Sequence, residues 1–415
     1  MEHIVIGAGP AGVVAAEQLR KFDPDGSVAL IGEEPEPPYS RMAIPYYLVK
    51  RIDESGTYLR KDPGHYTASG IEVLQDRVSS IDTANQSVNL ESGGKRRYER
   101  LAIATGASPI TPPIPGVDLP GVYNCWTLED ARNIIRLMEP GNSIVLIGAG
   151  FIGSIILEAL AASGVNLTVV ETENRMVPRM MNDIAGSMIK DWCVKKGVNV
   201  LTSTRVQSIE KGNPLTVKFD NNDSASADMV ITATGVKSNV AFLEGSGINV
   251  DDGIVVDEFL QTSLENVYAA GDCAQGKDFS TGGYSVQAIQ PTAVEHGRIA
   301  ARNMVRGHAQ GGHRGQVNMN VLDTLGLISS SFGMWMGVDG GDGVERVDRD
   351  GFRYINLQFE DDCLIGASSL GITDHVGVLR GLIQSRTRLG EWKQKLQDDP
   401  TRLMEAYLAN TQALG

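Results

Sequence analysis

Two glycine-rich segments carry the residues with the clearest chemistry in this sequence. Each reads G-x-G-x-x-G, and the glycines are Gly7, Gly9, Gly12, Gly148, Gly150 and Gly153. Glycines at this spacing allow a tight turn, a close approach of backbone to a pyrophosphate, and close packing of a helix on a strand. A helix that begins inside the motif offers free N–H groups and the positive end of its dipole to the phosphates.

The elements around the two motifs fit this chemistry. The apolar runs 4–6 and 144–147 precede the two copies and have the pattern of buried strands. An acidic residue ends the next apolar run in each case, Glu33 after the first copy and Glu171 after the second. A carboxylate about 20 residues beyond the motif is suited to bind a ribose hydroxyl. Two complete copies in this context predict two dinucleotide-binding sites.

Length, composition and charge limit the possible classes of protein. A chain of 415 residues is too long for one core and predicts two or three domains. Its 42% hydrophobic content and 47 glycines suit an α/β protein rich in turns. The net charge of −14 argues against nucleic acid or an anionic membrane as the main partner. A solvated acidic surface explains the charge, and so does docking to a basic patch on another protein.

The N-terminal region and the one long uncharged stretch bear on location. Met1 leads almost directly into the first expected strand, which leaves no room for a targeting peptide. The uncharged stretch 140–157 contains the second glycine motif, so a strand, turn and helix explain it better than a membrane span. We therefore expect a cytoplasmic protein without a membrane span.

The cysteines exclude two kinds of redox centre. The four cysteines show neither C-x-x-C nor metal-ligand spacing, and they are Cys125, Cys193, Cys273 and Cys363. A thioredoxin-like pair and a cysteine-bound iron–sulfur cluster within this chain are thereby excluded, and we expect no metal site. Only Cys273, which follows Gly271 and Asp272, lies among other candidate site residues.

The order of the segments is similar to that of a known family over nearly the whole chain. A glycine motif, Ala104-Thr105-Gly106, a second glycine motif, Ala233-Thr234-Gly235 and Gly271-Asp272 follow one another. This succession resembles the pyridine nucleotide-disulfide oxidoreductase superfamily of two-dinucleotide-binding flavoproteins. The branch that it resembles includes ferredoxin and rubredoxin reductases, NADH oxidases and the flavin domain of nitrite reductases.

The resemblance implies an α/β fold with two Rossmann-like dinucleotide-binding domains, for FAD and NAD, plus a C-terminal α+β domain. The implied FAD-binding domain is split into two segments, 1–110 and 238–315. The NAD-binding domain would lie between them at 111–237, and the C-terminal α+β interface domain would follow at 316–415. In the last of these, strands are expected over 317–323, 352–359 and 364–369, before an amphipathic helical tail over 376–413.

The resemblance also implies the residues of the FAD site. The first glycine motif would hold the pyrophosphate, Glu33 the adenosine ribose, and Asp272 the ribityl chain. A helix over 291–304 would aim its N-terminus at the flavin, where its dipole would stabilise the negative charge of the reduced form. Pro38-Tyr39-Ser40-Arg41 resembles a P-Y-x-R loop whose arginine lies beside the cofactor. The implied FAD residues are Gly7, Gly9, Pro10, Ala11, Gly12, Glu33, Arg41, Thr105, Gly106, Gly271, Asp272, Gln290, Pro291 and Thr292.

For the nicotinamide nucleotide the resemblance implies the second glycine motif and the second acidic residue. A carboxylate at Glu171 accepts hydrogen bonds from a free 2′-hydroxyl and repels a 2′-phosphate, which favours NAD(H). Arg175, four residues further on, could soften that preference. The implied NAD(H) residues are Gly148, Gly150, Phe151, Ile152, Gly153, Glu171, Thr234 and Gly235.

The sequence departs from the family pattern at residues that narrow the chemistry. The loop 39–45 has no cysteine where disulfide reductases and NADH oxidases carry a redox cysteine, and the region around His375 lacks their H-x-x-x-x-E pair. Tyr46 stands where ferredoxin reductases place a lysine. Ile155 stands where they place a glutamate, with Glu158 one turn further on. No thiol relay can therefore pass electrons onward, and no residue is assigned a catalytic role.

These features favour an FAD-dependent NAD(H):acceptor oxidoreductase that exchanges electrons with an iron–sulfur protein. The partner would be a diffusing ferredoxin or rubredoxin, or a subunit of a larger complex such as a 2-oxoacid oxidoreductase. An NADH oxidase or peroxidase and a non-catalytic NADH-sensing flavoprotein stay open, as do the direction of electron flow and homo- or hetero-oligomerisation. The tail and the segment 329–337, with Phe332, Trp335 and two methionines, are candidate partner surfaces, although core packing explains both.

Overall fold

The computed structural model describes residues 1–308 and 311–411, and these form two compact units. The first unit comprises 1–47, 52–108, 236–308 and 311–316, and the second comprises 48–51, 109–235 and 317–411. Each unit contains one glycine motif. The assignment of these regions to separate FAD-binding, NAD-binding and C-terminal domains stays a prediction.

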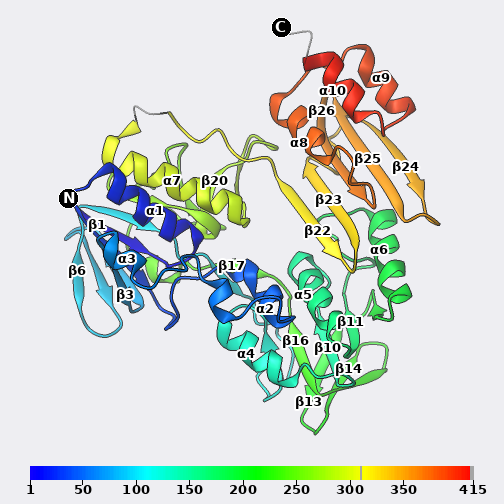
Figure 1. Cartoon of the computed structure of the whole chain (residues 1–415), viewed down its shortest axis with the longest axis horizontal. Coiled ribbons are helices and arrows are strands. Elements are labelled where there is room, and N and C mark those ends of the chain that lie inside the picture. The colour runs from blue at the N-terminus through cyan, green and yellow to red at the C-terminus, as the bar shows by residue number, and fades with distance from the viewer. Residues whose placement is uncertain (309–310, 412–415) are drawn as a thin grey trace. The chain divides into compact units, whose positions relative to one another are not determined.

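The first unit is built on a five-stranded parallel sheet in the order β19-β7-β1-β2-β3. The central strand β1 is buried from its second residue onward, as its apolar run predicts. Helices α1 and α7 pack closely against each other in this unit, blue and yellow in Figure 1. These elements are β1 Glu2–Ile6, α1 Pro10–Phe22, β2 Ser27–Gly32, β3 Ile71–Gln75, β7 Arg100–Ile103, β19 Val267–Ala269 and α7 Gln290–Arg306.

The second unit repeats this arrangement. Its parallel sheet has the order β12-β11-β10-β16-β9, so the strand that precedes the glycine motif is again central. These elements are β9 Val122–Asn124, α4 Leu128–Leu137, β10 Ser143–Ile147, α5 Phe151–Ala162, β11 Asn166–Val170, α6 Asp183–Lys195, β12 Asn199–Leu201 and β16 Met229–Thr232.

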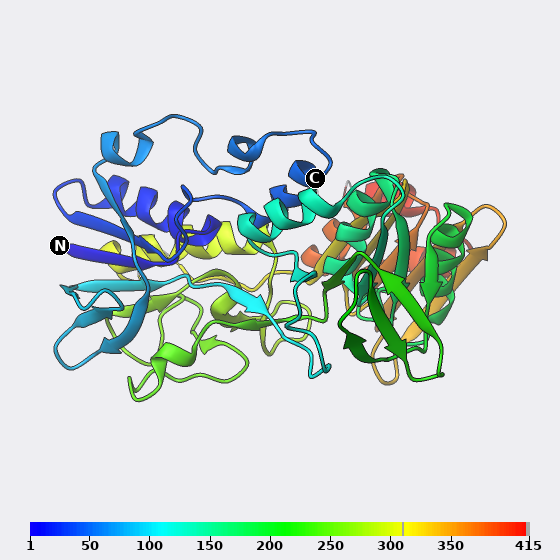
Figure 2. The ribbon, with the colours of Figure 1, turned by 90° about the horizontal axis from the view of Figure 1, so that it is seen from below.

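Each parallel sheet is accompanied by a three-stranded antiparallel sheet. These are β4-β5-β6 in the first unit and β13-β14-β15 in the second, the latter green in the foreground of Figure 2. Their bounds are β4 Val78–Asp82, β5 Ser87–Leu90, β6 Lys95–Arg97, β13 Val206–Glu210, β14 Leu215–Phe219 and β15 Ser224–Ala227. The expected α/β fold with two Rossmann-like halves is thus confirmed.

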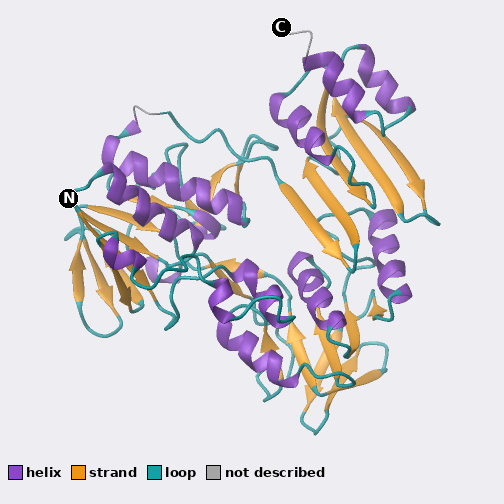
Figure 3. Ribbon diagram, viewed as in Figure 1, coloured by secondary structure: helices purple, strands orange, loops and turns teal. Residues whose placement is uncertain are grey.

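The second unit also contains a five-stranded antiparallel sheet, in the order β22-β23-β26-β25-β24. Helices α8 and α9 pack on this sheet, and α10 packs on both helices (Figure 3). The bounds are β22 Met319–Thr324, β23 Leu327–Gly333, β24 Asp342–Asp348, β25 Arg353–Glu360, β26 Cys363–Leu370, α8 Val376–Ser385, α9 Glu391–Asp398 and α10 Leu403–Thr411.

The expected helical tail over 376–413 is divided into those three helices. Arg386 and Gly390, both with positive φ, separate α8 from α9, and Pro400 precedes α10. Positions 412 and 413 lie outside the described residues.

In the candidate partner surface 329–337, Phe332 and Trp335 are buried, whereas Met336 is 77% exposed. Among the described residues no helix is long and apolar enough to cross a bilayer.

The remaining elements are short. Two short strands lie where the chain passes from one unit to the other, and they pair with each other. They are β8 Ala107–Pro109 and β17 Val236–Ser238. A small sheet has the order β18-β20-β21. The bounds are η1 Arg41–Ala43, α2 Ile44–Leu48, η2 Glu54–Thr57, α3 His65–Ala68, η3 Ala241–Leu243, β18 Ile254–Val255, η4 Gly271–Cys273, β20 Ala274–Lys277 and β21 Tyr284–Val286.

Candidate functional site

The two glycine motifs have the same geometry, and each glycine has its own reason to lack a side chain. Gly7 and Gly148 have φ of +107° and +103°, and a Cβ there would collide with the carbonyl oxygen of Ala104 or Ala233. A Cβ on Gly12 or Gly153 would strike the carbonyl oxygen of the first glycine of its own motif. These four positions are therefore required for the close approach of each loop and helix to the sheet.

The middle glycine of each motif differs from the other two. A Cβ on Gly9 or Gly150 would meet no atom within 4 Å, and both residues have ordinary extended backbone at the N-cap of α1 or α5. The protein itself thus leaves open space in front of each helix N-terminus. Unbonded N–H groups and the helix dipole make such a space suitable for a pyrophosphate.

The N-terminal turns of α1 and α7 converge on η4. A Cβ at Gly271 would lie 3.0 Å from the Cβ of Ala11 in α1 and 3.4 Å from that of Ala293 in α7. Gln290, the first residue of α7, accepts a 2.6 Å hydrogen bond from the Ser40 hydroxyl. Pro291 and Thr292 follow in the first turn, and the buried Thr292 hydroxyl has no hydrogen-bond partner among the described residues. Two positive helix ends therefore lie beside the Gly271-Asp272 segment.

Asp272 carries the most unusual carboxyl group of the first unit. Burial raises the pKa of Asp272 to about 6, and the nearby Arg41 guanidinium opposes that shift. Its side chain makes no hydrogen bond within the described parts of the chain, although its backbone oxygen accepts one from Ser238. A desolvated carboxylate without partners is costly, so the position suits a ligand that brings hydroxyl donors.

The loop after β2 fixes Arg41 through two side chains, and its expected place beside the cofactor stays a prediction. Its guanidinium donates to Glu34 at 2.6 Å and to the Tyr39 hydroxyl at 2.7 Å. Glu33, the expected ribose acid, is more than half exposed and pairs with Arg77 at 3.5 Å. The neighbouring Glu34 is the better-enclosed carboxylate, and the doublet Glu33-Glu34 in the sequence could not distinguish the two.

Each A-T-G segment forms hydrogen bonds with the residue that follows a short strand, Asn239 after β17 or Ile110 after β8. The Thr105 hydroxyl donates to the Asn239 carbonyl at 2.8 Å, and the Asn239 amide groups donate back to the carbonyl oxygens of Thr105 and Gly106. In the second unit the Thr234 hydroxyl donates to the Ile110 carbonyl at 3.1 Å, and the Ile110 N–H donates to the Gly235 carbonyl. Sequence reasoning missed Asn239, because nothing in its local pattern marks it.

Glu171 lies at the end of β11, where it was expected, but its carboxylate is already used. It is buried and accepts a 2.7 Å hydrogen bond from the Ala149 N–H inside the second glycine motif. Its other oxygen accepts from the Glu173 N–H and the Thr172 hydroxyl. The carboxylate therefore fixes the glycine loop and keeps only part of its acceptor capacity for a ribose. Phe151 and Ile152 begin α5 directly beyond this loop.

Arg175 is bound within the same loop. Its guanidinium donates to Asp183 at 2.6 Å and to the Met181 carbonyl at 2.9 Å. These bonds occupy the cation that sequence reasoning considered as a partner for a 2′-phosphate.

None of the four cysteines has the character of a reactive thiol. Burial raises the pKa of Cys125 and Cys193 to about 12, and burial also raises the pKa of Cys273 and Cys363. The Cys273 thiol donates to the carbonyl oxygens of Ile103 and Ala270. Because the thiolate is the reactive form, these groups are poor nucleophiles at neutral pH. Among the described residues no three His, Cys, Asp or Glu side chains gather as a metal site.

The comparisons with known proteins agree with this geometry. The model of the pyridine nucleotide-disulphide oxidoreductase family matches residues 1–297. Subunit epsilon of NADH-dependent phenylglyoxylate dehydrogenase from Aromatoleum evansii is 29% identical and spans 100% of this chain and 96% of its own. An NADH oxidase from Methanocaldococcus jannaschii is 31% identical over 73% of this chain and 70% of its own.

A solved structure also matches most of the chain. The crystal structure of a ferredoxin reductase from Rhodopseudomonas palustris superposes with a TM-score of 0.81 at 26% identity and covers 89% of this chain and 91% of its own. The paired glycine motifs, the partly buried carboxyl of Asp272 and these matches lead to one conclusion. The chain belongs to the pyridine nucleotide-disulphide oxidoreductase family and is an NAD(H)-dependent oxidoreductase that binds FAD.

Proposed function

We propose that this protein transfers electrons between NAD(H) and an iron–sulfur protein, and that its flavin passes them on directly. FAD would bind the first unit, with its pyrophosphate at Gly9 and its ribityl hydroxyls at Asp272. NAD(H) would bind the second unit at Gly150 and Glu171. A bound flavin supplies the conversion between the two electrons of NADH and single electrons. The protein's own contribution is to position the two nucleotides and to stabilise charge.

The observation that carries the proposal is the absence of a usable thiol. The chain has only four cysteines, none lies in the loop 39–45, and the pKa of every one is raised. Electrons that reach the flavin therefore have no covalent relay in this chain. The α7 N-terminus beside Gly271 would favour the added negative charge of a reduced flavin.

A relative supports a partner subunit as the acceptor. The chain matches the epsilon subunit of an NADH-dependent phenylglyoxylate dehydrogenase along its whole length. By analogy this chain would be the NAD(H)-linked flavoprotein subunit of a 2-oxoacid oxidoreductase or a similar complex. The second candidate is an NADH oxidase, because a relative of similar identity carries that name.

The residues that follow β11, from Glu171 to Asp183, support a preference for NAD(H). Glu171 and the exposed Glu173 place two carboxylates at the end of β11, while Asp183 holds Arg175 at 2.6 Å. A 2′-phosphate would meet negative charge there and no uncommitted guanidinium from Arg175.

Replacing the middle glycine of each motif by valine separates the two nucleotide sites. Gly9→Val fills only the open space before α1, so we expect a folded protein without bound FAD. Gly150→Val is the matched control, since it makes the same change at the N-cap of α5, and it should retain FAD but lose reduction by NADH. FAD released on denaturation and stopped-flow flavin absorbance measure both effects. Stoichiometric FAD in the Gly9 variant would contradict the assignment.

The charge at Glu171 should set nucleotide choice. Glu171→Gln removes the charge and keeps an acceptor for the Ala149 N–H, while its NH2 replaces the oxygen that accepts from the Glu173 N–H and the Thr172 hydroxyl. We expect binding of NADH to weaken by about 1–3 kcal/mol, measured as a rise in Kd. The difference between the Kd values for NADH and NADPH should become smaller at the same time. The control Glu33→Gln changes the corresponding acid of the first motif and should leave both nicotinamide nucleotides unaffected. If wild-type protein prefers NADPH, the assignment is wrong.

A cysteine-free variant tests direct electron transfer from the flavin. With Cys125, Cys193 and Cys363 changed to serine and the buried Cys273 to alanine, NADH-driven reduction of ferricyanide should stay close to the wild-type rate. Dithionite titration of wild-type protein should take up two electrons per FAD and show no thiolate-to-flavin charge-transfer band. Loss of ferricyanide reduction in a folded, FAD-replete variant would reveal a thiol relay.

A further inference from the structure

The loop between Glu171 and α6 is hydrogen-bonded to the second glycine motif. The Val177 N–H donates to the Ala149 carbonyl at 2.9 Å, next to the Ala149 N–H that binds Glu171. Val177 has φ of +44°, a costly conformation for a β-branched residue that persists only where surrounding contacts impose it. Met176, Met180 and Met181 are all at most 2% exposed. The apolar residues in the second half of the loop are therefore buried, whereas Thr172, Glu173 and Asn174 in its first half are exposed.

Asn182 joins the end of this loop to the antiparallel sheet of the same unit. Its side-chain oxygen accepts from the Ala185 N–H at 3.0 Å and caps α6. Its amide nitrogen donates to the Tyr354 hydroxyl of β25 at 2.8 Å and to Glu345 of β24 at 3.3 Å. One side chain thus links the start of α6 to two strands of the sheet.

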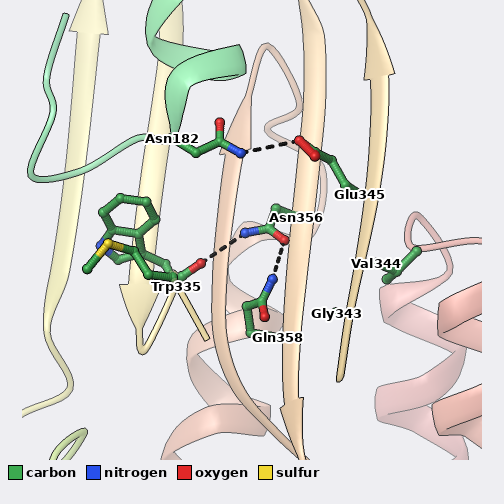
Figure 4. A pocket seen from close by; sticks show the side chains of 8 residues that line it. Asn182, Trp335, Gly343, Val344, Glu345, Asn356 and Gln358 are labelled. Carbon is green, nitrogen blue, oxygen red and sulfur yellow. Dashed lines mark hydrogen bonds between the residues drawn. The ribbon is translucent and has the colours of Figure 1, made fainter. Parts of the chain in front are cut away.

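The surroundings of this contact favour a structural connection over a ligand site. Tyr354 is fully buried, and burial beside Glu345 raises its pKa. Figure 4 shows Asn182, Glu345, Asn356 and Gln358 around a cavity of about 380 Å³. Gln358 donates to Asn356 at 2.7 Å, and Asn356 donates to the Trp335 carbonyl at 2.9 Å. These amide groups bond one another, so the cavity presents few open donors to a ligand.

The other end of α6 contacts the same sheet. Trp192 donates from its indole nitrogen to the Leu325 carbonyl at 3.2 Å, and its ring lies 5.0 Å from that of Phe352. Leu325 and Phe352 occupy the turns between β22 and β23 and between β24 and β25. α6 is therefore attached to the antiparallel sheet near both ends, and its first turn follows directly on the loop between Glu171 and α6.

We propose that Asn182 couples occupancy of the NAD(H) site to the antiparallel C-terminal sheet, through its bond to Tyr354. The proposal rests on the proposed function in one respect, namely that the adenosine ribose binds at Glu171. A ribose there competes for the carboxylate that fixes Ala149, and the packed loop transmits the adjustment to Asn182. By linkage, if the bound nucleotide stabilises the sheet, a change that weakens the sheet's attachment to the loop must also weaken nucleotide binding.

Hydrogen exchange with ADP-ribose, a nucleotide without a nicotinamide, tests this coupling in the FAD-loaded full chain. In wild-type protein we expect saturating ADP-ribose to slow exchange in α5 and also in β24 and β25. Asn182→Ser retains a helix cap but lacks the amide donor, and Tyr354→Phe removes the acceptor from the other side. Both variants should keep the slowing in α5, lose it in β24 and β25, and bind ADP-ribose about fivefold more weakly, at the lower end of usual coupling energies.

The control is Asn199→Ser, whose amide bonds Thr168 of the neighbouring strand in the nucleotide-binding sheet, and it should behave as wild type. Thermal unfolding of each variant verifies that the fold is intact. Slowing in α5 but not in the sheet of the wild type would overturn the coupling alone. No slowing at α5 or the glycine motif would overturn the nucleotide site itself. Unchanged slowing of β24 and β25 in both variants would show that Asn182 and Tyr354 do not carry the coupling.

Discussion

Both nucleotide sites depend on one close contact between a loop and the strand beside it. The first glycine of each motif lies against a carbonyl oxygen at the end of a neighbouring strand, Ala104 for Gly7 and Ala233 for Gly148. Each of those carbonyls belongs to an A-T-G segment, so in each unit the glycine motif and the A-T-G segment form one structure. The contact draws the loop onto the sheet, and the helix that follows then points its N-terminus into open space. Any side chain at the first glycine would push that helix away from its phosphate position.

The charged side chains Asp272 and Arg41 of the first unit lie close to this arrangement. Asp272 is desolvated beside two helix N-termini, with Arg41 as the nearby cation whose charge offsets some of the rise in its pKa. The guanidinium is itself held by Glu34 and Tyr39, while Ser40 contacts Gln290. A partly buried carboxyl without hydrogen-bond partners among the described residues is unfavourable in the protein alone, and bound hydroxyl groups would satisfy it. This carboxyl is one reason to propose that FAD binds in the first unit.

The sequence predicted the local features of this structure well. The two glycine motifs, the strands before them and the helix that begins at Gln290 follow from short patterns whose physics is local. The side-chain partners of Glu171 and Arg175 could not be predicted, because both depend on residues that fold back onto the loop. The C-terminal tail is divided into separate helices near Gly390 and Pro400. The helical periodicity of its apolar residues continues across both positions and does not indicate the division. The bond from Asn182 to Tyr354 joins residues 172 positions apart, and no local pattern indicates it.

The proposed function depends on one step, in which electrons leave the flavin singly and without a thiol. The most direct measurement is the stoichiometry of anaerobic NADH oxidation by cysteine-free, FAD-loaded protein with a rubredoxin or a [2Fe–2S] ferredoxin as the only acceptor. We expect two acceptor molecules to be reduced for each NADH, at the rate of the wild-type protein, and NADH oxidation to be much slower when oxygen is the only acceptor. Rapid NADH oxidation by oxygen, with neither iron–sulfur protein reduced, would contradict the proposed step.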